Sequence, residues 1–356
     1  MIDGKGREKA KQCMACETVV IGLNWVGDNV LAIPAYRALQ HRFRSEGGIA
    51  VAAPENVAAL LDASGIFKQV IAWNGSTRKR IAALRTGGGF RRAVILPNSF
   101  RAAAVTFAAG IRERWGYPTD LRRILLTHPV ARPEPRGHQL DDYTSLLAAL
   151  NAPRVVDETP VIKLPPTIRE YGRRRLLEIG MHLDRPIFAV HAGGLYGRAK
   201  HWGDTRYVDT IKKLRIEGFD VVLLTSPGER DQAERIATTC NGVPIVGHDG
   251  DVLEMAAALS QCAALITNDS GPLHVAAALD VPSVSIFGPT DPGRTVIAGA
   301  TRVVRRTLSC QPCYQRECPL GHHRCMSDVS VDEVFQAAVG LVSGVEPDVT
   351  AHHIEA

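Results

Sequence analysis

Residues 266–295 read ITNDSGPLHVAAALDVPSVSIFGPTDPGRT, and this stretch decides the fold. An apolar strand ends at Asn268, a helix rich in small residues follows, and a second apolar strand ends at Gly288. Strand–helix–strand units of this kind build parallel sheets, which bind ligands outside the carboxyl ends of their strands. The stretch therefore predicts a sheet edge that holds a small, polar and anionic ligand.

The same alternation extends along most of the 356 residues. Short apolar runs suited to buried strands occur at residues 17–23, 48–54, 67–73, 92–98, 186–193, 219–226, 243–247, 263–268 and 282–288. Helical patterns lie between them, one from about residue 29 to residue 43. Near residues 331–343 an amphipathic helix follows a Cys-rich loop.

Residues 151–166, NAPRVVDETPVIKLPP, hold four prolines, cannot form a helix and predict a linker. The fold class predicted is α/β, with two Rossmann-like doubly wound domains that face a cleft between them. The expected boundaries are a tail over 1–16, an N-terminal domain over 17–150, the linker over 151–166, a C-terminal domain over 167–345 and a tail over 346–356.

The charge of the chain is unevenly divided. The formal net charge is +5, of which residues 1–160 carry +8 and residues 161–356 carry −3. A basic half can attract phosphate, nucleic acid or an anionic membrane surface, or can simply be a solvated face. Nucleic acid is disfavoured because no aromatic residues alternate with the basic ones to stack on bases.

Composition indicates a cytoplasmic location. No apolar run is long enough to span a membrane, and the polar first residues lack the apolar core of a secretory signal. In a reducing compartment the eight cysteines are thiols or metal ligands rather than a disulfide framework.

Asp28 lies in NWVGDNVLAIP, where a strand ends and a helix begins. A carboxylate at a strand tip beside a cleft can act as a general base. An Asp at a helix start can equally cap the helix, and capping uses the same oxygens.

Two further strand ends carry candidate donor-site residues. In HAGGLYGRAKHWG, Gly193 and Gly194 let backbone amides approach a ligand, and Lys200 supplies a charge for phosphate oxygens. In LTSPGERDQAERI, Glu229 and Asp231 can accept hydrogen bonds from a ribose or can favour the helix N-terminus through its dipole.

The opening stretch supplies the remaining candidates. The exposed amides at the start of its helix form an anion site. Asp269, which would repel phosphate directly, more plausibly fixes the loop or accepts a hydroxyl or ammonium group. Beside it we expect an anion site formed by Ser270, Gly271, His274, Gly288 and Thr290. A purely structural role for these residues is the alternative.

Cys310, Cys313, Cys318 and Cys325 have the spacing C-x₂-C-x₄-C-x₆-C. This spacing is typical of a closed structural zinc or iron site, which has no open position for catalysis. The alternative is a short loop that buries its thiols.

The ordered combination of WVGDNVLAIPAYRAL, GRAKHW, NDSGPLHVAAAL, FGPTDPGRT and CQPCYQRECPLGHHRC resembles glycosyltransferase family 9, the ADP-heptose:lipopolysaccharide heptosyltransferases, and most of all the heptosyltransferase II type. The resemblance implies the GT-B fold. It also implies inverting transfer of heptose from ADP-L-glycero-D-manno-heptose to the lipopolysaccharide inner core, without a catalytic metal or other cofactor. The expected acceptor is Kdo-lipid A or heptosyl-Kdo-lipid A, reached by peripheral contact with the cytoplasmic face of the inner membrane.

By position, the resemblance makes Asp28 the catalytic base and Lys200 the lysine that holds the donor diphosphate. Asp269 matches the aspartate of the donor motif, and Ser270, Gly271 and His274 match residues beside the diphosphate. Either Glu229 or Asp231 falls where the family contacts the ribose. The chain departs from the family pattern with His191 in place of a common Pro and Pro272 in place of the usual Leu.

Three other functions remain open from the sequence. A family 9 enzyme can use another nucleotide sugar or glycosylate a protein. A sugar-nucleotide epimerase shares the fold but needs acid and base groups around the sugar, which are not found. A non-catalytic nucleotide-binding or scaffold protein would not need Asp28 and Lys200 together.

Overall fold

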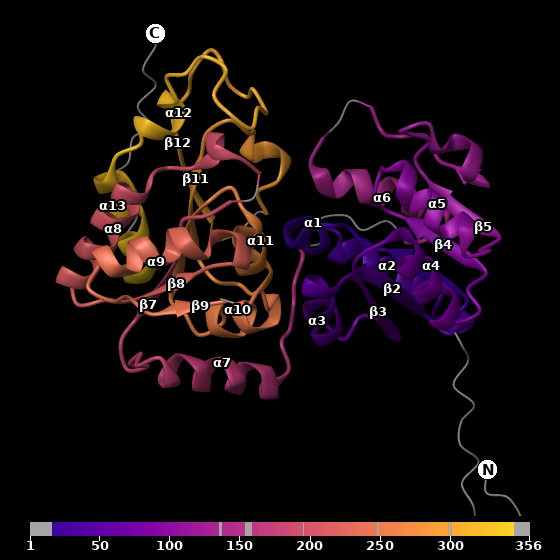
Figure 1. Cartoon of the computed structure of the whole chain (residues 1–356), viewed down its shortest axis with the longest axis horizontal. Coiled ribbons are helices and arrows are strands. Elements are labelled where there is room, and N and C mark those ends of the chain that lie inside the picture. The colour runs from indigo at the N-terminus through magenta and orange to yellow at the C-terminus, as the bar shows by residue number, and fades with distance from the viewer. Residues whose placement is uncertain are drawn as a thin grey trace, which may run out of the picture.

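A computed structural model describes residues 16–344, apart from residues 135–136, 154–158, 195, 248, 298 and 300. It contains two parallel six-stranded sheets, one in each half of the chain (Figure 1). The predicted α/β fold with two doubly wound sheets is thus confirmed. The tails expected over 1–16 and 346–356 lie outside the described residues, apart from Cys16.

The first sheet has the order β3-β2-β1-β4-β5-β6, with every pair parallel. Its strands are β1 (Thr18–Ile21), β2 (Ile49–Pro54), β3 (Gln69–Trp73), β4 (Arg92–Ile95), β5 (Glu113–Gly116) and β6 (His128–Pro129). The helices of this half are α1 (Val26–Leu31), α2 (Ile33–Arg42), η1 (Arg44–Glu46), α3 (Glu55–Ala63), α4 (Thr77–Thr86), α5 (Phe100–Ala108), η2 (Arg122–Leu125) and α6 (Gln139–Ala149).

The second sheet has the order β12-β11-β10-β7-β8-β9, again all parallel. Its strands are β7 (Ile187–His191), β8 (Asp220–Leu224), β9 (Ile245–Val246), β10 (Ala264–Asn268), β11 (Ser283–Phe287) and β12 (Thr301–Arg305). The helices are α7 (Pro166–Glu178), η3 (Arg198–Lys200), α8 (Asp204–Ile216), η4 (Pro227–Glu229), α9 (Arg230–Thr239), α10 (Val252–Leu259), α11 (Gly271–Ala278), η5 (Pro292–Arg294), α12 (Arg324–Ser327) and α13 (Val331–Ser343).

Both faces of the central strands are buried. Val20 and Val19, adjacent on β1, belong to different hydrophobic clusters because successive side chains point to opposite faces. This burial explains why the central strands read as continuous apolar runs. In each sheet the strand order reverses at one point, between β1 and β4 and between β7 and β10. Ligands of doubly wound sheets bind at such points.

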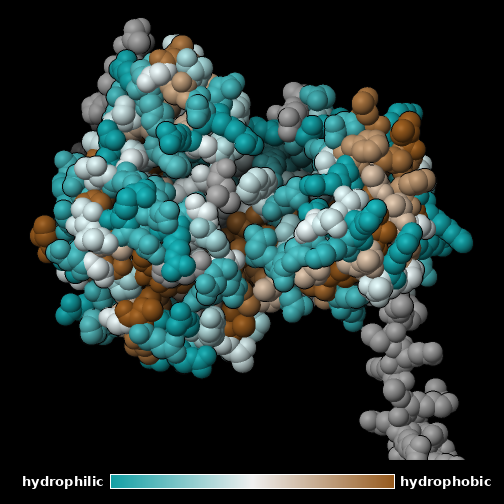
Figure 2. All heavy atoms as spheres, viewed as in Figure 1, coloured by the Kyte–Doolittle hydropathy of each residue, from teal (hydrophilic) through white to brown (hydrophobic). Residues whose placement is uncertain are grey.

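One hydrophobic cluster joins the two halves. It contains Val30 and Leu60 from the N-terminal half and Leu259 and Val275 from the C-terminal half. Helix α1 packs on α11, and α3 packs on α10. The carboxyl ends of the two sheets are therefore held close together, and the surface is hollowed between the two lobes (Figure 2).

Some elements differ from the sequence-based expectation. The helix expected over 29–43 is two helices, α1 and α2, with Ala32 between them and Pro34 in the first turn of α2. Strands β5, β6 and β12 were not predicted because they are short, polar or at a sheet edge. Among helices within the described residues, none is both long and apolar enough to cross a membrane.

Candidate active site

The carboxyl ends of β7 and β10 bring the predicted donor-site residues together. The two strands are paired, so the loop at Gly193 and Gly194 lies beside Asp269 and Ser270. Ser270 is the N-cap residue of α11, whose first amides face the same edge. Pro272 in the first turn has no N–H, so the Gly271 amide is the first one open to a ligand. The anion site at this strand end remains a prediction.

Lys200 and Asp269 form the central ion pair of this site. The distance from Lys200 Nζ to Asp269 Oδ2 is 2.5 Å, and both side chains are nearly buried. Thr290 donates a hydrogen bond to the same carboxylate oxygen (2.7 Å), and Asn268 donates to the Lys200 carbonyl (2.9 Å). The ammonium also lies 4.5 Å from the centre of the Tyr196 ring. Asp269 thus holds the lysine and Thr290 at one place, as expected for a residue that fixes the loop.

Glu229 belongs to a buried polar chain that includes His191. His191 Nε2 lies 3.2 Å from Glu229 Oε2, and His191 Nδ1 lies 3.2 Å from Ser270 Oγ. Ser226 also donates to Glu229 (2.6 Å). Burial alone would raise the pKa of Glu229, but the hydrogen bonds from His191, Ser226 and the Gly194 amide outweigh it and lower the pKa to about 2. Glu229 is therefore an ionised acceptor at neutral pH.

Glu229 and Asp231 are placed differently. A Cβ added at Gly193 would lie 2.3 Å from Glu229 Oε1, so a glycine there lets this carboxylate reach the strand tip. Asp231 is exposed in the first turn of α9. Of the two candidates left open by the sequence, Glu229 is the one that lies in the polar network of the strand tips.

Asp28 lies in the first turn of α1 and does not act as its N-cap, which is Trp25. Gln139, at the start of α6, donates a hydrogen bond from Nε2 to Asp28 Oδ1 (2.8 Å). Burial raises the pKa of Asp28; the Gln139 hydrogen bond and the charge of Lys200 oppose this, and the charge of Asp269 adds to it. A carboxylate with a raised pKa is a stronger base than an ordinary Asp. Charges of the C-terminal half, on Lys200 and Asp269, thus reach Asp28 in the N-terminal half.

Two glycines allow α1 and α11 to approach closely. A Cβ at Gly27 would lie 2.5 Å from His274 Cδ2, and a Cβ at Gly271 would lie 2.5 Å from Val26 Cγ1. Neither glycine has a positive φ, so the requirement is for space rather than for backbone conformation. Glycine at both positions therefore brings the Asp28 helix to the N-terminus of the donor-site helix.

His274 is neutral at physiological pH. Burial lowers the pKa of its imidazole to about 4. Its Nδ1 is buried and has no hydrogen-bond partner within the described residues. His274 can therefore offer a neutral hydrogen-bonding group to a ligand, but it does not supply a positive charge.

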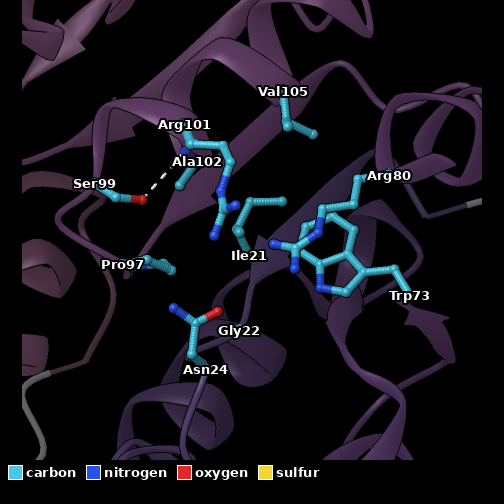
Figure 3. A pocket seen from close by; sticks show the side chains of 10 residues that line it. All are labelled: Ile21, Gly22, Asn24, Trp73, Arg80, Pro97, Ser99, Arg101, Ala102 and Val105. Atoms are coloured by element: carbon cyan, nitrogen blue, oxygen red, sulfur yellow. Dashed lines mark hydrogen bonds between the residues drawn. The ribbon is translucent and has the colours of Figure 1, made fainter. Parts of the chain in front are cut away.

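A basic pocket opens at the carboxyl ends of β1, β3 and β4 (Figure 3). Its lining residues are Ile21, Gly22, Asn24, Trp73, Arg80, Pro97, Ser99, Arg101, Ala102 and Val105. The guanidinium groups of Arg80 and Arg101 point toward the same space, and neither forms an ion pair within the part of the chain described. Burial, with the nearby charge of Arg101, lowers the pKa of Arg80, whose Nε is buried without a partner. Arg80 also stacks on the Trp73 ring (5.4 Å to its centre), and the two guanidinium groups give the pocket a positive charge that can attract an anion.

The Cys-rich loop braces the donor side of the cleft. Its backbone at Arg316 accepts from Ala199 N (3.0 Å), and its Tyr314 carbonyl accepts from Tyr196 Oη (2.6 Å). His323 bonds to the Ala199 carbonyl (2.9 Å). The loop therefore holds the segment that carries Lys200.

The space beside Gly288 is also filled from this loop. A Cβ at Gly288 would lie 2.4 Å from Met326 Sδ and 3.2 Å from Cys325 Sγ. Packing against the loop therefore accounts for the glycine at this position, which was predicted as a donor-site residue.

No group of three or more His, Cys, Asp or Glu side chains in the described ranges is arranged to hold a metal ion. Cys325 is buried, and Cys310, Cys313 and Cys318 are half-buried free thiols. The zinc or iron site expected from the cysteine spacing thus gains no support, and elemental analysis of the purified protein is its direct test.

Sequence reasoning missed three residues of the site. Gln139 lies 111 positions from Asp28, and no local pattern connects them. The sequence marks His191 only as a departure from a family pattern. Asn29 is fully buried and shapes the loop before α1, because its side chain accepts from Leu23 N (3.1 Å) and donates to Trp25 O (2.7 Å). In the sequence, only the position of Asn29 next to Asp28 in NWVGDN pointed to a role at the site.

Known proteins resemble this chain over most of its length. A family model described as glycosyltransferase family 9 (heptosyltransferase) matches residues 78–324. Lipopolysaccharide heptosyltransferase 2 of Salmonella typhimurium is 28% identical over 344 residues, which cover 91% of this chain and 98% of the relative.

Solved structures resemble the whole fold. The Escherichia coli ADP-heptose lipopolysaccharide heptosyltransferase II superposes with a TM-score of 0.77 at 26% identity, over 92% of this chain and 99% of that one. A family 9 glycosyltransferase of Veillonella parvula gives a TM-score of 0.79 at 19% identity, over 92% and 98% of the two chains. The GT-B arrangement of two Rossmann-like sheets expected from the resemblance is thereby confirmed.

Proposed function

Because the chain belongs to glycosyltransferase family 9, we propose that it transfers heptose from ADP-L-glycero-D-manno-heptose to the inner core of lipopolysaccharide. The observation that carries this proposal is the close packing of α1 on α11, which brings the helix of Asp28 to the helix start where we propose that the donor diphosphate binds. Relatives named as heptosyltransferase 2 match over nearly their whole length and support the choice of sugar.

The donor diphosphate would bind at the start of α11. The Gly271 amide and the ammonium of Lys200 would contact its oxygens. Thr290 would add its hydroxyl once this turns from Asp269, to which it donates in the structure. Lys200 has three donor hydrogens, and Asp269 and the ring of Tyr196 fix its direction. Ionised Glu229 would accept hydrogen bonds from the ribose.

Asp28 would act as the general base. It takes the proton from an acceptor hydroxyl while that oxygen forms a bond to the anomeric carbon. The bond from this carbon to the diphosphate oxygen breaks, and its electron pair leaves with ADP. Attack from the face opposite to the departing ADP inverts the anomeric configuration. We propose that Lys200 and the α11 amides meet the charge on ADP without a divalent metal or other cofactor, since such preorganised donors lower a barrier by about 3–4 kcal/mol each.

The acceptor would bind in the N-terminal half. Asn24, four residues before Asp28, lines the pocket with Arg80 and Arg101, and this pocket would take an anionic group. The carboxylate of a Kdo sugar or a phosphate of the inner core has this chemistry. We propose Kdo-lipid A or heptosyl-Kdo-lipid A as the acceptor, reached from the cytoplasmic face of the inner membrane.

An assay for released ADP tests the proposed function. The protein is incubated with ADP-heptose and a heptose-deficient lipopolysaccharide, and ADP and the acceptor mass are followed together. We expect ADP release and addition of one heptose. Transfer only from another nucleotide sugar, or only to a protein acceptor, would instead identify a different family 9 activity.

The variant Lys200→Ala tests the donor site. Loss of its charge should weaken ADP-heptose binding, measured by calorimetry, and should also lower turnover. The half-buried Lys213 of α8, which pairs with Asp332 of α13, gives the control variant Lys213→Ala. Unchanged donor affinity in Lys200→Ala would contradict the role given to this lysine.

A further inference from the structure

The outer face of α5 is apolar although it faces solvent. Phe100 is 42% exposed and Phe107 is 55% exposed, and the partly buried Ala104 and Ala108 lie on the same face by their i, i+4, i+7 and i+8 spacing. A surface helix normally presents charged or polar residues on this side. A contiguous apolar face on a protein surface marks a place of interaction.

The turn beside α5 extends this face. Leu121 is 88% exposed and Ile124 is 83% exposed, and α5 packs against the η2 turn that carries Ile124. Leu121 and the preceding Asp120 both have left-handed backbone angles, with φ of +57° and +51°. This conformation is unfavourable for a leucine. We call Phe100, Phe107, Leu121 and Ile124 the apolar edge.

The apolar edge is held in place by the buried Arg122. Its Nε donates to the Tyr117 carbonyl (2.7 Å), and its Nη atoms donate to the Pro97 carbonyl and to Asn98 Oδ1. Asp120 accepts a hydrogen bond from Phe100 N (2.6 Å) and so ties the turn to α5. The exposed side chains therefore stand on a braced turn rather than on a free loop.

Basic residues surround the apolar edge. Residues 100–125 contain five arginines and two acidic residues, a net charge of +3. Arg101, Arg112 and Arg123 are exposed, while the acidic Glu113 is paired with Arg91 and Arg92. Hydrophobic residues gather over this end of the N-terminal lobe among hydrophilic ones (Figure 2). Apolar side chains with arginines around them suit the headgroup region of an anionic bilayer.

The apolar edge adjoins the basic pocket. Arg122 binds the backbone of Pro97, which lines that pocket, and α5 contributes Arg101 to the pocket. We propose that the apolar edge docks on the surface of a bilayer that contains anionic lipids, with Leu121 and Ile124 entering the headgroup layer. The inference rests on the proposed function in one respect, since a lipid-borne acceptor would then present its headgroup at the pocket.

Vesicle flotation tests the docking directly. The whole protein is mixed with vesicles of phosphatidylethanolamine and phosphatidylglycerol, or of phosphatidylcholine alone, neither of which contains lipopolysaccharide. We expect binding to the anionic vesicles that weakens with salt. The double variant Leu121→Asn/Ile124→Gln should lower the partition coefficient by at least about tenfold, since each side chain loses several buried carbon atoms. Asparagine tolerates the left-handed backbone at 121, so the variant keeps its fold.

Ile216→Gln is the matched control, because Ile216 is 82% exposed at the end of α8 in the other half. It should bind vesicles as the unchanged protein does. Absence of binding by the unchanged protein, equal binding by the double variant, or an equal loss in Ile216→Gln would each overturn the proposal. So would sedimentation showing that the double variant only converts a dimer to a monomer.

A second measurement separates this proposal from the proposed function. The double variant should release ADP at the normal rate with a deacylated, water-soluble acceptor, and at a reduced rate with an acceptor embedded in vesicles. If no ADP is released with either acceptor, the proposed function is wrong. Vesicle binding would still test the docking of the apolar edge. If the double variant and the unchanged protein release ADP at equal rates with the embedded acceptor, docking of the apolar edge does not bring the enzyme to its substrate.

Discussion

At the residue scale, the proposed function depends on how the surroundings of Asp28 shift the pKa of its carboxyl. Burial favours the protonated carboxyl, while Gln139 and Lys200 favour the ionised one, and burial prevails. The folded state therefore binds this proton more tightly than the unfolded chain does. Protonated Asp28 therefore adds to the free energy of unfolding at low pH. This contribution is lost as the pH rises through the folded-state pKa, so the ionised carboxylate makes the fold less stable at neutral pH than at low pH.

The variant Asp28→Asn should separate catalysis from folding. Turnover should fall roughly 10²–10⁴-fold, the usual contribution of a general base, while the affinity for ADP-heptose stays within about twofold. The melting temperature at pH 7 should equal or exceed that of the unchanged protein, because asparagine is never ionised. Asp62→Asn, at an exposed site on α3, is the control. Retained turnover in Asp28→Asn would remove Asp28 from the role of base.

The pH profile should follow the same carboxyl. Activity needs the ionised form, so kcat/KM should rise with pH through a pKa above the ordinary value for Asp. Gln139→Ala removes a hydrogen bond that lowers this pKa, and should move the acid limb to higher pH with little change in donor affinity. The exposed Gln69 supplies the control variant Gln69→Ala. If the acid limb of the kcat/KM profile stays at the same pH in Gln139→Ala, the limb reflects the titration of a group other than Asp28.

Single residues were predictable from sequence only where a local pattern carried them. Asp28, Lys200 and Asp269 follow strand ends or glycine-rich turns. The structure pairs Lys200 with Asp269, and the roles given to the three residues remain predictions. Gln139 was not predictable because its partner is distant in sequence. The choice of Glu229 over Asp231 needed three-dimensional contacts, since both lie near the same helix start.

At the element scale, the contact of α1 with α11 assembles the site. The two helices come from different halves, and each has a glycine where the other presents a side chain. A helix–helix approach this close leaves no room for a methyl group. The distance between the proposed base and the donor site is therefore set by these glycines.

Gly27→Ala should disturb the site without a change in any polar group. The added Cβ would overlap His274, so α1 must move from α11 or the imidazole must turn. We expect a loss of about 1–3 kcal/mol in stability by denaturant unfolding, and a larger proportional loss in turnover than in donor affinity. Gly89→Ala is the control, since its Cβ meets nothing within 4 Å. If Gly27→Ala retains full stability and turnover, the close approach is not required.

Elements were predictable where burial imposed a clear pattern. The central strands, which are largely buried on both faces, follow the predicted runs; they are β1, β2, β4, β7, β8, β10 and β11. Strand β5 reads ERWG and carries charged residues at its start, so no apolar run marked it. The bracing of the Lys200 segment by the Cys-rich loop depends on contacts over more than one hundred positions, which periodicity does not encode.

At the scale of the whole molecule, two sheets share one core at the base of the cleft. The alternation of strands and helices predicted both sheets, and the four prolines near residue 160 predicted the passage between them. The sequence did not indicate how closely the halves approach, because the cluster that joins them draws on α1, α3, α10 and α11 together. The proposed boundaries at 150 and 167 remain predictions, for which limited proteolysis is the test.

The most direct test of the central claim is a crystal structure of the Asp28→Asn variant with intact ADP-heptose. We predict that the diphosphate lies within about 3 Å of Lys200 Nζ and Gly271 N, with the anomeric carbon of the heptose facing the side chain at position 28. A donor bound elsewhere, or one whose anomeric carbon faces away from α1, would contradict the claim that the two helices form one active site.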